Sequence, residues 1–353
     1  YPGCTDDEGM SEYKSDAFAM GEFFLVFLVP TFLLAFCYSK IYAEAHKNLG
    51  YAFQSLYRCA EAEASYKRAI ALRPDYAEAH FNLGDTLREL GRLREAESSF
   101  RQTIGLDPKN ADAHSCLGLL AYYDGHSKSA LSLLREAQQL DPKSKRNNLL
   151  VRVLCERLHA SDKKSKNIQT NKPAIITRPF PNPTVVHNNV NENLIDHLYE
   201  LRTIDLDKAR DPSFGNSKGS WQLFDTENPV IRALEIELET IMVDAVKSDV
   251  FVWESFFSIF AAGSGTTRHN HVMPGLDEDP HFSLAKKKYS LVYYLRVGDQ
   301  NCAKPGFLKL YDPEKSILPT NGMIAIFPAS RDHSSEYDGT LDRVIVGVNF
   351  YSI

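Results

Sequence analysis

Three stretches at one spacing decide the fold of the first half of the chain: AEAHKNLG at 43–50, AEAHFNLG at 77–84 and ADAHSCLG at 111–118. Each begins thirty-four residues after the one before it. The columns that repeat at this period are Ala45, Ala79 and Ala113; Gly50, Gly84 and Gly118; Ala62, Ala96 and Ala130; Tyr66, Phe100 and Leu134; and Pro74, Pro108 and Pro142. So many columns at one period indicate a structural repeat.

The residue types in these columns predict pairs of helices. Small residues mark the places where two helices touch, large apolar residues fill the space between them, and proline closes each unit after its second helix. Each pair leaves an apolar face uncovered, so neighbouring units must stack into a right-handed solenoid with a concave surface. His46, His80 and His114 also repeat at this period, so we assign them to the solenoid and not to a metal site.

The pattern resembles the tetratricopeptide repeat. The resemblance implies an all-α solenoid of three repeats and a capping helix over residues 41–158, which binds a protein or peptide in its groove. NNLLVRVLCERL at 147–158 has helical periodicity and is the expected cap. The alternative is that the repeats only dimerise the protein or brace a second domain.

A second domain is expected, because 353 residues exceed what one hydrophobic core usually organises. Residues 159–174 form the expected linker, since SDKKSKNIQTNK at 161–172 is polar and free of large apolar side chains. Over 175–353 the pattern becomes alternating, with short apolar runs between turn residues, which predicts a sandwich or small barrel. Helices are expected at 191–201 and 230–249, and strands at 251–262, 289–297, 306–311, 322–327 and 343–351.

Three histidines and one arginine stand out against these strands. His269 and His271 form an HxH pair, and residues two apart in an extended strand point to the same face, so their imidazoles can converge on one ion. His333 comes just past the strand GMIAIFP, sixty-four residues after His269. Arg343 lies ten residues further on, in the last expected strand.

This order resembles the Fe(II)/2-oxoglutarate-dependent oxygenases, in which His-x-Asp/Glu is followed by a distal His and then by an Arg. YSLVYYL, GFLKLYDP, PTNGMIAIFPASRDH and RVIVGVNFY extend the resemblance over residues 250–351, and the group with an HxHP-like first motif is the most similar. The resemblance implies a double-stranded β-helix, or jelly-roll, α+β domain. It also implies a dioxygenase that uses Fe(II), 2-oxoglutarate and O2, with ascorbate as an accessory reductant, to hydroxylate a protein or peptide recruited by the repeats.

The sequence departs from that pattern where the carboxylate ligand is usual, because this position holds His271. Three imidazoles remain reasonable ligands for Fe(II). The alternative third ligand is a residue of the following loop, namely Asp277, Glu278, Asp279 or His281. We prefer His271, because only it has the strand spacing that brings two side chains to one face.

Arg343 is expected to bind the distal carboxylate of 2-oxoglutarate, because its planar guanidinium suits a bidentate, charge-assisted pair. Tyr293 and Ser290 are further candidates to line the cosubstrate pocket, and no catalytic side chain is expected beyond the metal centre. Two other functions fit the same residues. One is a non-catalytic scaffold with a degenerate oxygenase-like domain, and the other is a cupin-type metalloenzyme that uses three His without 2-oxoglutarate.

Composition and the first forty residues limit the partners and the location. The formal charge of -6 offers no basic surface for nucleic acid, which is therefore not an expected partner. Six scattered cysteines without a CxxC pair favour a reducing compartment and a cytoplasmic protein. Residues 1–40 lack the repeat, and 17–38 are mostly apolar, so a membrane anchor is the alternative. The almost wholly apolar core of that run, 23–38, is shorter than the ~20 residues of a spanning helix.

Overall fold

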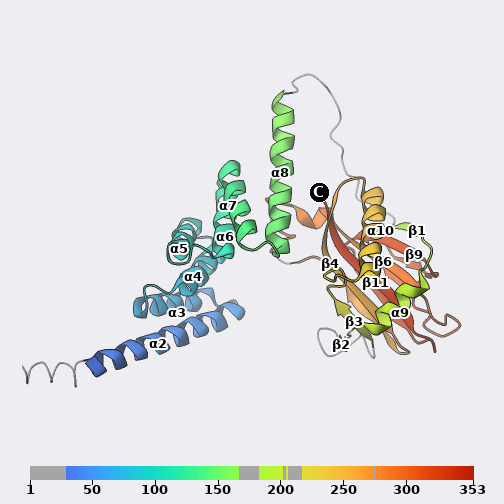
Figure 1. Cartoon of the computed structure of the whole chain (residues 1–353), viewed down its shortest axis with the longest axis horizontal. Helices are drawn as coiled ribbons and strands as arrows, with labels where there is room; N and C mark the ends of the chain where they lie inside the picture. Colours follow the sequence, from blue (N-terminus) through green and yellow to red (C-terminus); the bar gives the residue numbers. More distant parts are fainter. Residues whose placement is uncertain (1–28, 167–182, 202–203, 206–216, 274) are drawn as a thin grey trace, which may run out of the picture. The chain divides into compact units, whose positions relative to one another are not determined.

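The computed structural model describes residues 29–166, 183–201, 204–205, 217–273 and 275–353 (Figure 1). The chain divides into two compact units, Tyr1–Cys155 and Glu156–Ile353. The helices described in the first unit are α2 (Val29–Ser55), α3 (Cys59–Leu72), α4 (Ala77–Glu89), α5 (Leu93–Leu106), α6 (Ala111–Tyr123), α7 (Ser127–Leu140) and the first half of α8 (Lys145–Lys166). They pair as α2 with α3, α4 with α5, and α6 with α7, as the period of thirty-four residues predicts.

The repeated glycines lie where the two helices of a pair meet. A Cβ atom on Gly84 of α4 would lie 2.8 Å from the ring of Phe100 in α5, and one on Gly50 would lie 2.6 Å from the ring of Tyr66. Protein interiors are close-packed, so such contacts leave no room for a side chain at these positions. The predicted helix contacts are therefore confirmed.

The histidines of the repeat have a structural role. Nε2 of His80 lies 3.0 Å from the backbone oxygen of the proline six residues earlier, and Nε2 of His114 makes the equivalent contact at 3.1 Å. In α8, Asn148 occupies the next position of the series and donates from Nδ2 to the corresponding proline oxygen at 3.0 Å. The assignment of His80 and His114 to the solenoid is confirmed.

The first and last helices of this region run past the residues at which the solenoid was expected to begin and end. Residues 29–40 continue the first repeat helix without a break, while 1–28 lie outside the described residues. Helix α8 continues to Lys166, so the start of the expected linker is helical, which is compatible with the high helix propensity of its lysines. The remainder of that segment, 167–174, also lies outside the described residues. Of the helices that are described, none is long and apolar enough to cross a membrane.

The second unit is built on antiparallel strands. In the part that is described, these are β1 (Thr184–His187), β2 (Ile204–Asp205), β3 (Lys218–Trp221), β4 (Val250–Phe260), β5 (Ser264–His269), β6 (Lys288–Arg296), β7 (Leu308–Leu310), β8 (Lys315–Ile317), β9 (Met323–Pro328), β10 (His333–Tyr337) and β11 (Arg343–Ser352). One sheet has the order β1-β9-β6-β11-β4-β3-β2 and the other has the order β5-β10-β7-β8. The five strands expected from the sequence correspond to β4, β6, β7, β9 and β11.

Helices α9 (Glu192–Glu200) and α10 (Pro229–Val246) cover one face of the seven-stranded sheet (Figure 1). Alternate residues of β11, from Val344 to Phe350, are fully buried in the core that these helices share with the sheet. Ile345, on the opposite face of β11, packs with Leu308 and Leu310 of β7. The two sheets therefore face each other, and the helices lie outside them.

Candidate metal centre

Two of the predicted histidines face each other across the edge of the four-stranded sheet. His269 is the last residue of β5 and His333 is the first residue of β10. The antiparallel register places these two residues directly opposite each other, with ring centroids 4.3 Å apart. The pairing of two polar strands thus brings together histidines that are sixty-four residues apart in sequence.

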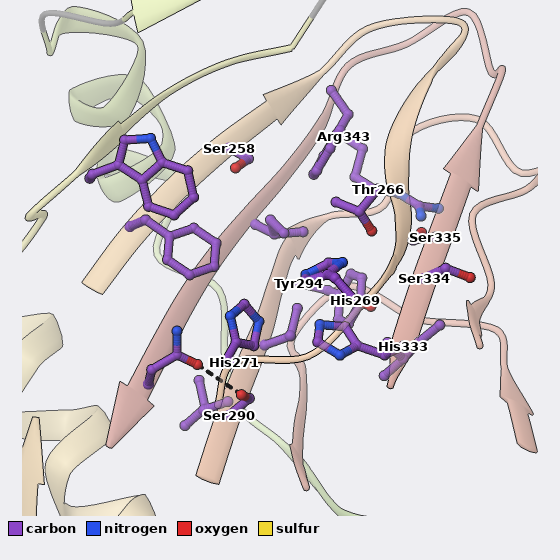
Figure 2. A pocket seen from close by; sticks show the side chains of 18 residues that line it. Ser258, Thr266, His269, His271, Ser290, Tyr294, His333, Ser334, Ser335 and Arg343 are labelled. Atoms are coloured by element: carbon purple, nitrogen blue, oxygen red, sulfur yellow. Dashed lines mark hydrogen bonds between the residues drawn. The ribbon is translucent and has the colours of Figure 1, made fainter. Parts of the chain in front are cut away.

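His271 joins them, although not by the expected strand geometry. Strand β5 ends at His269, so His271 lies in the loop that follows, where its backbone N–H donates to the carbonyl of Ala329 at 2.9 Å. Its ring centroid is 5.0 Å from those of both His269 and His333. One ring nitrogen of each histidine lies within 4.8 Å of the others, a grouping that could hold a metal ion. Figure 2 shows the three imidazoles together, with Arg343 farther along the same pocket.

Backbone carbonyls orient the rings of His269 and His333, and burial favours the neutral imidazoles of His271 and His333. Nδ1 of His269 lies 2.7 Å from the carbonyl of Thr267, and Nδ1 of His333 lies 3.2 Å from that of Arg331. A carbonyl only accepts, so each Nδ1 carries the proton and each Nε2 is left to bind a cation. Burial, together with the neighbouring imidazoles, lowers the pKa of His271 to about 2. Burial likewise lowers the pKa of His333 to about 3.

The acidic alternatives for the third ligand do not belong to this group. Asp277 is buried, and its carboxylate accepts hydrogen bonds from Lys288, Tyr351 and the backbone of Met273. The neighbouring candidates Glu278, Asp279 and His281 lie outside the histidine group as well, and Glu278 and His281 are exposed. The donor set offered to an ion is therefore three histidines.

Arg343 is the first residue of β11, lines the same cavity, and is 1% exposed. Its guanidinium donates to three backbone carbonyls, those of Val297 (3.1 Å), Gly306 (2.6 Å) and Pro305 (2.5 Å). The guanidinium carbon also lies 4.5 Å from the ring centroid of Tyr337. Burial lowers the pKa of Arg343, but a guanidinium stays charged at neutral pH.

The expectation for Tyr293 is wrong, because it lies on the opposite face of β6 from Ser290. Tyr293 belongs to the core beneath the helices, and its hydroxyl donates to the carbonyl of Asn189 at 3.2 Å. Residues 290, 292 and 294 share the inner face, so Tyr294 lines the cavity with Ser290. Tyr294 could have been identified from the sequence, because it lies four residues after Ser290 and residues an even number apart share one face of a strand. Ser290 lines the cavity and donates to Oδ1 of Asn349 at 2.8 Å (Figure 2).

The cavity lies between the two sheets and is partly open to solvent. Its walls are mostly apolar and include Trp221, Phe256, Phe260, Val292 and Leu308. The rings of Trp221 and Phe256 are in contact, with centroids 5.1 Å apart. The ionisable side chains that line it, among the described residues, are the three histidines, Tyr294 and Arg343.

Comparisons with known proteins concern the helical unit. A tetratricopeptide-repeat family model matches residues 47–111 and 84–145. The first tetratricopeptide domain of Spaghetti (RPAP3), solved with the HSP90 peptide SRMEEVD, is 18% identical over 34% of this chain and 95% of its own, with a TM-score of 0.33. The Arabidopsis OM64 tetratricopeptide domain is 24% identical over 34% of this chain and 98% of its own, also with a TM-score of 0.33. The search of curated proteins gave no match.

Sequence repeat, helix packing and family match agree, so the N-terminal half contains tetratricopeptide repeats. The C-terminal half is a two-sheet antiparallel β domain with a cluster of three histidines that could bind a metal ion.

Proposed function

We propose that the β domain is an Fe(II)- and 2-oxoglutarate-dependent dioxygenase that hydroxylates a protein or peptide. One observation carries the proposal: His269, His271 and His333 converge in the cavity that Arg343 also lines. A cation site and a buried guanidinium in one cavity suit a metal ion with a small diacid bound beside it.

The strand order supports a double-stranded β-helix. From β4 to β11 the chain passes back and forth between the sheets, with β4, β6, β9 and β11 in one and β5, β7, β8 and β10 in the other. These strands form two facing quartets, β9-β6-β11-β4 and β5-β10-β7-β8. Eight antiparallel strands in two facing sheets are typical of the jelly roll, an architecture that cupins share.

The three histidines fit Fe(II), for which imidazole is a suitable ligand. When bound, iron would supply the redox chemistry with which O2 and 2-oxoglutarate oxidise a substrate C–H bond. The chain's own contribution is orientation: the carbonyls of Thr267 and Arg331 fix two imidazoles so that each presents Nε2. The apolar walls of the cavity would exclude water from the substrate.

Arg343 and Tyr294 are the proposed groups for the distal carboxylate of 2-oxoglutarate. Guanidinium has five N–H groups, and the three carbonyl contacts use one on each nitrogen, so each terminal nitrogen keeps one for a ligand. Tyr294 is 2% exposed and lines the cavity together with Arg343. A phenolic hydroxyl is a hydrogen-bond donor, so it can donate to a ligand carboxylate that the guanidinium also binds.

The repeats are proposed to recruit the substrate, because stacked helix pairs present an extended concave surface on which peptides bind. The described cysteines are free, which supports the reducing, cytoplasmic environment that we propose.

The experiment that tests this function is succinate production by the full chain with Fe(II), ascorbate and 2-oxoglutarate. We expect succinate from the unaltered protein, increased by a peptide substrate, and none from His333→Ala. His281→Ala, at an exposed histidine outside the cluster, is the matched control and should keep full turnover. Absence of succinate from the unaltered, iron-loaded protein with every peptide tried would favour the non-catalytic scaffold.

A three-histidine metalloenzyme that does not use 2-oxoglutarate is the second candidate. It is favoured by the three carbonyls that accept from Arg343, because they stabilise part of the buried guanidinium without an anion. Titration of 2-oxoglutarate into the Co(II)-loaded protein separates the two functions. Saturable binding supports the dioxygenase, and the lack of any binding supports the second candidate.

A further inference from the structure

A buried ion pair lies next to the metal centre without being part of the ligand set. Nζ of Lys288 lies 2.9 Å from Oδ2 of Asp277, and both side chains are at most 1% exposed. Oδ2 also accepts from the backbone N–H of Met273 at 2.6 Å, and Oδ1 accepts from the hydroxyl of Tyr351 at 2.6 Å. Removing two charges from water is costly, so a pair of this kind is weak evidence for stability and invites another explanation.

These contacts fix the loop that carries His271. Met273, which Asp277 holds, lies two residues after His271 in the sequence. The backbone N–H of His271 donates to the carbonyl of Ala329 at 2.9 Å, and the N–H of Ala329 donates to the carbonyl of Lys288 at 2.9 Å. Through Ala329, His271 and Lys288 are thus tied to the same point of the sheet.

His271 needs such support more than the other two histidines do. His269 and His333 are held by the register of β5 with β10, whereas β5 ends before His271. The Asp277 carboxylate in turn connects the loop to β6 through Lys288 and to β11 through Tyr351. Strands β6 and β11 of the larger sheet therefore help to hold the loop that carries His271.

We propose that Asp277, held by Lys288 and Tyr351, is the positioning residue of His271. Its carboxylate does not touch the ion; it fixes the loop so that the imidazole of His271 meets those of His269 and His333. The inference rests on the proposed metal centre, and not on the use of 2-oxoglutarate. Partners that orient a metal ligand commonly affect metal affinity about 10- to 100-fold.

Cobalt binding to the full chain tests the proposal, because Co(II) reports its ligand geometry through its visible absorption. Asp277→Asn should weaken Co(II) binding about 10- to 100-fold and change the absorption bands. Glu278→Gln, at the exposed neighbouring residue, should alter neither. Unchanged affinity and bands in Asp277→Asn would overturn the proposal.

A double-mutant cycle separates positioning from general loosening of the fold. If Asp277 acts through His271, then Asp277→Asn added to His271→Ala should weaken Co(II) binding by no more than about twofold. A second loss as large as the first would show that Asp277 acts elsewhere, and the proposal would fail. If Asp277→Asn does not fold, Tyr351→Phe keeps the ion pair and removes one hydrogen bond. It should shift the same bands with a smaller loss of affinity, and unchanged bands would again refute the idea.

The outcomes distinguish this proposal from the proposed enzyme. Co(II) binding requires no turnover. The expected result of the double-mutant cycle therefore supports Asp277 as the positioning residue even if the protein shows no enzymatic activity. If His269→Ala leaves Co(II) affinity unchanged, the metal centre itself is refuted, and the role of Asp277 with it.

Discussion

Acidification should destabilise the metal-free β domain through His271 and His333. Burial lowers the pKa of these side chains to about 2 and about 3, whereas a free imidazole titrates near ~6.5. Between these values the unfolded chain binds a proton at each position and the folded chain does not. The stability is therefore fully present above pH ~6.5 and is lost progressively as the pH falls toward the folded values.

The expected loss is large. Each imidazole that is protonated only in the unfolded chain lowers the free energy of unfolding by about 1.4 kcal/mol for each pH unit of acidification. The two imidazoles together lower it by about 2.7 kcal/mol per pH unit. From pH ~6.5, where each unfolded imidazole is half protonated, to pH ~5 the integrated loss is about 3 kcal/mol, which is a considerable part of the stability of a domain.

The assay is urea unfolding of the chelator-treated protein at several pH values. Trp221 and Trp253 are the two tryptophans of the chain and both belong to the β domain, so their fluorescence follows this domain separately from the solenoid. His271→Gln should reduce the pH slope by about 1.4 kcal/mol per unit. His281→Gln, at an exposed position, is the control and should keep the slope. Equal slopes for His271→Gln and the unaltered protein would show that the imidazole is not held neutral in a preorganised site.

Three further predictions concern the cosubstrate groups and the helix contacts. Arg343→Lys keeps the charge but loses the planar guanidinium, so the KM for 2-oxoglutarate should rise on the order of tenfold while the affinity for Co(II) stays unchanged. Equal KM values for the variant and the unaltered protein would show that Arg343 does not bind the cosubstrate. Tyr294→Phe should raise the same KM about fivefold, the equivalent of one hydrogen bond, and Tyr293→Phe, on the far face of β6, should not. Gly84→Ala should destabilise the solenoid by about 1–3 kcal/mol in thermal unfolding followed by circular dichroism, because its Cβ would meet a ring. Gly105→Ala, where a Cβ meets nothing within 4 Å, should instead stabilise the helix by about 1 kcal/mol.

The solenoid could be predicted from the sequence because its packing rule is local and repeats. The same small residue returns to the same helix contact every thirty-four positions, so each copy confirms the others. The ends could not be predicted this way. The end of α8, for example, depends on helix propensity in a polar stretch that lacks the repeat.

The histidine cluster could be predicted as a set, but not the way in which it forms. The spacing of His269, His271 and His333 indicated convergence, yet the HxH argument assumed a strand that in fact ends at His269, two residues before His271. Strands β5 and β10 were missed because SGTTRH and HSSEY lack apolar alternation, which is natural for strands whose side chains surround a polar site. The error at Tyr293 was a miscount of faces along a strand that was itself predicted correctly.

The place of β11 in the larger sheet has a consequence for the order of folding. This strand lies between β4 and β6, and its ladder with β4 joins residues more than 80 positions apart. Helix pairs of the solenoid need only neighbouring segments and can form early, whereas the β domain must close a long loop before its middle is complete. Until β11 pairs, apolar strands such as β6 lack one partner, so we expect the newly made chain to be most exposed to aggregation during this interval.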